Sequence, residues 1–220
     1  MRQLDPAAVR WHLPTDSESP DSDTPDTLLV LLHGLGSHEG DLFALVPRLP
    51  QGLAVASLRA PLPWQVGRAW YELGFVPGEV EPRFDPQQVA DSAHAIESWV
   101  EDHAGEFRRV ILAGFNQGAG MALYVTAFSA DRLGGRLAGV VSLSGLLPFE
   151  PADAPAPSRV PAFVAVGDYD EVIGPVRAKR VTDWATQHLD AEVHNYPIGH
   201  WVSPEELDDL HRFLAGLLAD

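Results

Sequence analysis

The segment from Val110 to Gly120 constrains the fold of this chain more than any other. A short run of β-branched and apolar residues, Val110 to Ala113, is followed by glycines in the pattern G-x-N-x-G and then by helix-forming residues. Glycine at positions 114 and 118 lets the chain reverse sharply and lets a helix pack close to the strand that it leaves. The segment therefore predicts a buried strand, a tight turn centred on Asn116, and a helix.

Apolar runs alternate with helix signals along the rest of the chain. Leu28 to Leu32 is continuously apolar, which is typical of a central strand covered on both faces. Two helices have clear start signals, at Asp85-Pro86 and at Ser203-Pro204-Glu205-Glu206. Further strands are predicted at 9–13, 53–57, 137–143, 160–166 and 191–196, and a further helix from residue 175. This order predicts an α/β fold, with a doubly wound, mostly parallel sheet of about seven strands, helices on both faces and no large cap domain.

Length and composition indicate one domain that does not bind nucleic acid or anionic membrane surfaces. A chain of 220 residues commonly forms a single α/β domain, so residues 1–220 are expected to share one fold, with residues 15–27 as an acidic surface loop. The formal net charge of −16 disfavours nucleic acid and anionic membrane surfaces as partners. The absence of cysteine excludes disulfides and thiolate metal sites.

The sequence predicts a cytoplasmic protein without a cofactor. Met1 to Pro6 contain no apolar run typical of a signal peptide, and the longest aliphatic run, Leu28 to Leu32, is too short to span a bilayer. No two of the nine histidines have metal-ligand spacing such as H-E-x-x-H. Neither a metal nor another cofactor is therefore expected.

The chain contains, in this order, a nucleophile position at Asn116, a candidate acid at Asp170 and a candidate base at His200. A nucleophile on a tight turn needs a base to accept its proton and a carboxylate to hold that base in one tautomer. His200 follows a predicted strand and a glycine, and Asp170 follows a different strand, so both are expected at the sheet edge that carries Asn116. Asp168, two residues from Asp170, is an alternative acid.

Two loops are expected to complete the site. His33 and several glycines directly follow the central strand, and His33 is expected to support the turn of that loop. Residues 67–78 combine aromatic residues with Gly and Pro and fit no helix or strand period, so Trp70 and Leu73 are predicted to line an apolar pocket beside Asn116. The alternative is that the aromatic side chains pack beneath the loop as a separate hydrophobic cluster.

Together these motifs resemble the phospholipase/carboxylesterase family of small α/β-hydrolases, which includes the acyl-protein thioesterases. The resemblance runs from about residue 28 to 218 and depends on four ordered motifs, His33-Gly34-Leu35-Gly36, Gly114-Phe115-Asn116-Gln117-Gly118, Gly167-x-x-Asp170-x-Val172 and Gly199-His200. It implies hydrolysis of esters or thioesters of small or acyl substrates through an acyl-enzyme, with Asp170 and His200 as acid and base. It also implies an oxyanion hole from the backbone N–H groups of Leu35 and Gln117.

At the position where this family has its nucleophilic serine, this chain has Asn116. An amide nitrogen is delocalised and a poor nucleophile, so His200 has no hydroxyl proton to accept and the acyl-enzyme route is expected to fail. Asn suits the backbone, because the turn residue is expected at positive φ, which Asn tolerates. Three explanations stay open: an active-site variant of an esterase, a protein that has lost hydrolysis and kept binding, or an enzyme in which Asn acts in another way.

Two functions of different classes follow. The first is a carboxylesterase or thioesterase-type hydrolase with Asn116 at the nucleophile position, and the alternative is a non-catalytic ligand- or partner-binding protein on the same fold. Asp170 and His200 favour the first, because a pure binding protein has no evident need for an acid–base pair. The missing serine favours the second. The expected partner is a small-molecule ester or thioester.

Overall fold

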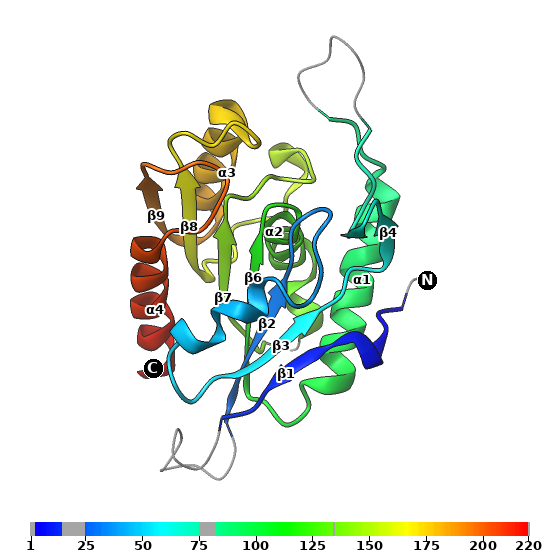
Figure 1. Ribbon diagram of the computed structural model, residues 1–220, viewed down its shortest axis with the longest axis vertical. Coiled ribbons are helices and arrows are strands. Elements are labelled where there is room, and N and C mark those ends of the chain that lie inside the picture. Colours follow the sequence, from blue (N-terminus) through cyan, green and yellow to red (C-terminus); the bar gives the residue numbers. More distant parts are fainter. Residues whose placement is uncertain (1–2, 15–24, 75–81, 134, 220) are drawn as a thin grey trace.

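The computed structural model describes residues 3–14, 25–74, 82–133 and 135–219, and its centre is a seven-stranded sheet in the order β1-β3-β2-β6-β7-β8-β9 (Figure 1). Within this sheet β1 is antiparallel to β3, and the other neighbouring strands are parallel. The strands are β1 Arg10–His12, β2 Thr27–Leu32, β3 Ala54–Leu58, β6 Arg109–Phe115, β7 Leu137–Leu143, β8 Pro161–Gly167 and β9 Asp190–Tyr196. The predicted doubly wound, mostly parallel sheet is confirmed.

Helices cover both faces of the sheet, because the side chains of its central strands alternate between two hydrophobic clusters. On one face, Leu28, Val30 and Leu32 pack with apolar residues of three helices. On the other face, Leu29 and Leu31 pack with the last helix and with a 3-10 helix, Leu42–Arg48. The helices of the first face are α1 Pro86–His103, α2 Gln117–Ser129 and α3 Gly174–His188, and the last is α4 Pro204–Ala219. None of the described helices is both long and apolar enough to cross a membrane.

The two predicted helix starts are confirmed by their caps. The Asp85 side chain accepts a hydrogen bond from Gln87 N at 2.9 Å at the start of α1. At α4, Ser203 Oγ accepts from Glu206 N at 3.1 Å, and Glu206 Oε2 accepts from Ser203 N at 3.2 Å. This reciprocal pair satisfies two backbone donors that the helix itself leaves unpaired.

A short hairpin, β4 Leu62–Trp64 and β5 Gly67–Ala69, replaces part of the predicted loop. Its strands have three residues each, too few for an alternating pattern to be recognised in a sequence. Its turn includes Gln65 at φ 49°, a conformation that side chains other than Gly rarely adopt. Residues 75–78 of that loop and residues 15–24 of the predicted acidic loop lie outside the described residues.

Glu206 is expected to make the stability of the fold depend on pH. Its side chain is buried, and burial raises the pKa of its carboxyl group from an ordinary 4.5 to about 7. The folded state therefore holds this proton more strongly than the unfolded state, and stability falls as the pH rises from about 4.5 through about 7. Urea titrations at pH 5 and pH 8 measure the fall in the free energy of unfolding between the two pH values. Glu206→Gln should make this fall smaller by up to roughly 3 kcal/mol. The exposed neighbour Glu205→Gln is the control, and an unchanged pH dependence in Glu206→Gln would contradict the expectation.

Candidate active site

Asn116 occupies the sharp turn between β6 and α2. Its φ of 52° and ψ of −114° confirm the predicted positive φ, and its backbone N–H donates to Leu143 O at 3.0 Å. Position 118 of the turn must be glycine, because a Cβ atom there would lie 2.0 Å from the Leu32 carbonyl oxygen. The turn therefore places the side chain of residue 116 at the carboxyl edge of the sheet, where open α/β sheets bind ligands.

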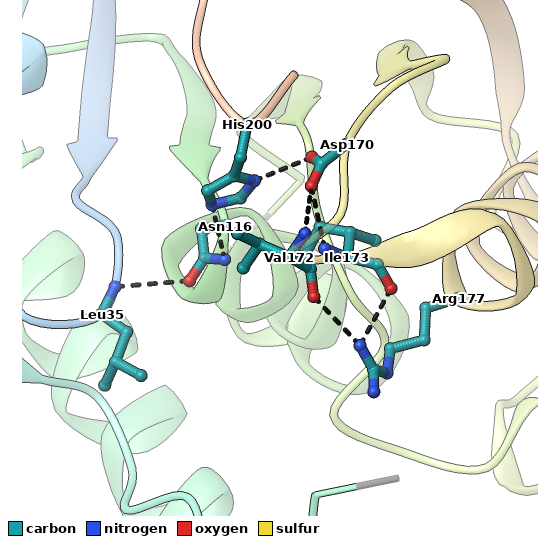
Figure 2. Close-up of polar contacts among 7 residues, drawn as sticks. All are labelled: Leu35, Asn116, Asp170, Val172, Ile173, Arg177 and His200. Carbon is teal, nitrogen blue, oxygen red and sulfur yellow. Dashed lines mark hydrogen bonds and ion pairs between the residues drawn. The ribbon is translucent and has the colours of Figure 1, made fainter. Parts of the chain in front are cut away.

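Asp170 and His200 form a hydrogen-bonded pair facing this turn (Figure 2). His200 Nδ1 lies 2.7 Å from Asp170 Oδ2, and Asp170 Oδ1 accepts from the backbone N–H groups of Val172 and Ile173, both at 2.9 Å. Asp170 is 6% exposed, so these three bonds hold a buried carboxylate in one orientation. Because the carboxylate accepts from Nδ1, the Nε2 atom of His200 is left as an acceptor that faces residue 116.

The alternative acid, Asp168, is not in contact with His200. Its side chain is exposed and accepts from Asn195 Nδ2 at 3.3 Å. Its backbone N–H donates to Tyr196 O at 2.8 Å. Of the two carboxylates, Asp170 is therefore the one next to His200, and it is also the one in the sequence motif.

The Asn116 side chain contacts both His200 and the backbone of the loop after β2. Its Nδ2 lies 3.0 Å from His200 Nε2, and its Oδ1 accepts a longer hydrogen bond, 3.4 Å, from Leu35 N. The Leu35 N–H thus points at the side chain of residue 116. Gln117 is the first residue of α2, where backbone N–H groups have no partner within the helix.

A cavity of about 310 Å³ opens beside Asn116, and Leu73 lies in its wall, where the sequence placed it. Four other apolar wall residues lie at or after the ends of β6, β7 and β8, because those strands finish at the same edge, and Leu35 and Pro82 come from the loop after β2 and the segment before α1. The polar side chains in the wall are Ser37, Asp41, Asn116, Arg177 and His200, so a ligand there meets polar groups as well as an apolar surface. The lining residues are Gly34, Leu35, Ser37, Asp41, Leu73, Pro82, Phe115, Asn116, Leu146, Val172, Ile173, Arg177 and His200.

The predicted pocket position of Trp70 is wrong. Trp70 is fully buried in the larger hydrophobic cluster and is absent from the cavity wall. Its Nε1 donates to His33 O at 2.9 Å, so the indole lies under the loop that follows β2. Tyr71 is also fully buried. The alternative interpretation is right that both aromatic side chains are packed in the interior, but wrong that they form a separate cluster, because both belong to the larger hydrophobic cluster.

His33 supports its loop, as expected. Its Nε2 accepts from Ala60 N at 3.1 Å and its Nδ1 donates to Gly34 O at 2.8 Å, an arrangement that only the neutral ring can make. Burial lowers the pKa of His33, which keeps the ring neutral. Among the described residues, no group of three or more His, Asp or Glu side chains is placed to hold a metal ion.

An ion pair that sequence reasoning missed fixes the far end of the same loop. Arg59 donates to Glu39 through Nε at 2.7 Å and Nη2 at 2.5 Å, and this hydrogen bonding lowers the pKa of Glu39 to about 2. The two residues are 20 positions apart and belong to different loops. No local pattern in the sequence signals such a pair.

A strand, sharp turn and helix at the edge of a mostly parallel sheet, with an Asp–His pair facing the turn, define an α/β-hydrolase. The chain belongs to the phospholipase/carboxylesterase family, whose model matches residues 18–218. It is 29% identical over 158 residues to acyl-protein thioesterase 1 homolog 1 of Dictyostelium discoideum, covering 68% of each chain. It is 27% identical over 215 residues to acyl-protein thioesterase 1 of Kluyveromyces lactis, covering 87% of this chain and 92% of that one.

Solved structures give the same fold. The carboxylesterase of Bacillus cereus matches with a TM-score of 0.78 at 17% identity, covering 95% of this chain and 93% of that one. At this level of identity the likeness concerns the arrangement of strands and helices. It agrees with the sheet order described above.

Proposed function

We propose that this protein binds esters or thioesters of small or acyl substrates, and that residue 116 decides whether a bound substrate is hydrolysed through an acyl-enzyme. One observation carries the proposal: His200 Nε2 and the Leu35 N–H both point at the side chain of residue 116, while Asp170 holds His200 from behind. A base, an acid and an oxyanion donor therefore converge on one side-chain position.

With a hydroxyl at position 116, His200 Nε2 accepts its proton as the oxygen attacks the substrate carbonyl carbon. The carbonyl oxygen becomes an oxyanion, which the N–H groups of Leu35 and Gln117 stabilise. His200 then returns the proton to the leaving alcohol or thiol, and water repeats the sequence on the acyl-enzyme. Asp170 keeps the imidazole in the required tautomer throughout.

With Asn at this position the covalent route is closed. The amide nitrogen is not nucleophilic, and its N–H is directed to His200 Nε2 rather than to a substrate. Direct attack by water remains, since in one serine hydrolase the oxyanion hole and binding alone retain roughly a thousandfold rate over water after the nucleophile is lost.

The cavity wall supports an acyl substrate. Leu73, Phe115 and Leu146 give an apolar surface next to the reacting position, which removes water from the acyl group and strengthens the electrostatic contacts there. Relatives named acyl-protein thioesterase and carboxylesterase support the same substrate class. We further propose that residues 1–220 form one domain and that the protein acts in the cytoplasm.

Non-catalytic binding is the second candidate, and the Asn116 side chain favours it. Its amide group contacts His200 Nε2 and the Leu35 N–H together, so a ligand carbonyl would exchange for the Asn116 carbonyl at Leu35 without meeting a nucleophile. The cavity and the Asp–His pair would then serve recognition alone.

Binding by the unchanged protein can be tested with a ketone analogue of an acyl thioester, in which a methylene group replaces the sulfur so that the carbonyl is kept and the molecule cannot be hydrolysed. Calorimetry is expected to give saturable binding at one site, and Leu73→Asp is expected to weaken it at least about tenfold, because a carboxylate would replace part of the apolar wall. Leu13→Asp, at a position 59% exposed beyond β1, is the control and should change little. No saturable binding at any chain length, or equal weakening in both variants, would contradict the proposal.

A further inference from the structure

The side chain of Gln117 joins the start of α2 to the segment after β5. It is fully buried, and both of its polar atoms are used. Its Oε1 accepts from Trp70 N at 2.7 Å, and its Nε2 donates to Tyr71 O at 2.7 Å. The residue directly after the turn therefore holds a backbone segment 46 positions away.

That segment in turn holds the loop that carries Leu35. Gly36 N donates to Arg68 O at 2.8 Å, and Arg68 N donates to Ser37 O at 2.9 Å. On the other side of Leu35, the Trp70 indole donates to His33 O at 2.9 Å. The loop is therefore attached to residues 68–70 on both sides of the Leu35 N–H.

We infer that the Gln117 side chain is a positioning residue for the oxyanion hole, an inference that rests on the proposed function. The backbone N–H of Gln117 is one proposed oxyanion donor, and its side chain, through Trp70, fixes the loop that presents the other. One residue thus sets the separation of the two donors. The spacing is critical, because oxyanion donors act at about 2.7–3.1 Å and a misplacement of about 1 Å costs on the order of 100-fold in rate.

The inference is tested in protein carrying Asn116→Ser, by adding Gln117→Met. Methionine has similar length and no amide, so it removes both hydrogen bonds without leaving a large cavity. Ser92 Oγ also donates to Trp70 O, so the segment keeps an attachment and the fold is expected to survive. We expect kcat, normalised to titrated active sites, to fall about 100-fold while KM changes less than about threefold. The affinity for a boronic acid that mimics the tetrahedral intermediate should fall in parallel with kcat.

Gln88→Met is the matched control. Gln88 Oε1 accepts from Glu72 N at 3.0 Å, so this change also removes an amide brace from the same segment, one residue beyond Tyr71. Gln88 does not adjoin the turn and is half-buried. We expect its kcat to stay within about twofold of Asn116→Ser. Gln117→Glu, which keeps an acceptor for Trp70 N and loses the donor to Tyr71 O, replaces Gln117→Met if the latter does not fold.

Two outcomes overturn the inference. One is a folded Gln117→Met protein whose kcat and boronic acid affinity stay within about threefold of Asn116→Ser, and the other is an equal loss in Gln88→Met. Failure of Asn116→Ser itself to hydrolyse any ester contradicts the proposed function instead. In that case, the inference is tested by amide hydrogen exchange of residues 33–37 in protein that keeps Asn116. Faster exchange in Gln117→Met but not in Gln88→Met supports the positioning role, and equal exchange overturns it.

Discussion

Asn116→Ser is expected to raise the hydrolysis of short-chain esters by several orders of magnitude over the unchanged protein. The expectation follows from the cost of the reverse change, since removing the serine from one serine hydrolase lowers turnover about a millionfold. The new hydroxyl would lie within reach of His200 Nε2, which is 3.0 Å from the present side chain. Serine is smaller than asparagine, so the turn does not have to enlarge. A chromogenic ester assay measures the gain, and intact-mass detection of an acyl adduct identifies the covalent route.

Two further changes test whether the gain uses the proposed site. In the Asn116→Ser protein, His200→Ala should abolish the gain because no base remains to accept the hydroxyl proton. Asn116→Ala, which also removes the amide but adds no hydroxyl, should give no acyl adduct. A folded Asn116→Ser protein that is as inactive as its parent on esters and thioesters of all acyl lengths would favour the non-catalytic binding function.

The positions of the site residues along the chain could be predicted because they depend on local signals. The strand before Asn116 is continuously apolar, the glycines around it permit a sharp turn, and helices follow the turn and His200, the second of them with a capped start. In a parallel sheet all such turns meet at one edge. The closeness of the loops that carry Asp170 and His200 then follows from the neighbouring positions of β8 and β9, while the conformation of the loop after β8 decides that Asp170 rather than Asp168 contacts the ring.

The contacts that support the site could not be predicted, because they join loops whose relative position is set by the folded chain. Trp70 looks the same in a sequence whether its ring lines a pocket or lies under a loop. Its burial depends on a three-residue hairpin strand that pairs with Ser37, outside the main sheet. The Glu39–Arg59 pair and the Gln117 side chain bridge loops in the same way. Local propensity carries no information about such contacts.

Gly118→Ala is expected to destabilise the protein by at least about 4 kcal/mol, a large part of the stability of an ordinary domain. A Cβ at this position would lie 2.0 Å from the Leu32 carbonyl oxygen and 2.6 Å from that of His33. These are backbone atoms, and Leu32 is paired with Leu58 on one side and with Gly114 on the other, so β2 cannot move away. The start of α2 must shift instead. Urea titration and thermal unfolding measure the loss.

Gly216→Ala is the control, because nothing lies within 4 Å of a Cβ at that position of α4. Alanine there should stabilise the protein by up to about 1 kcal/mol, since it restricts the unfolded chain and favours the helix. If Gly118→Ala loses less than about 1 kcal/mol, α2 moves away from β2 at little cost. The turn would then move with the helix, and the gain expected from Asn116→Ser should disappear when Gly118→Ala is added. A double variant that is both stable and active would show that close packing of α2 on β2 is not what holds residue 116 in place.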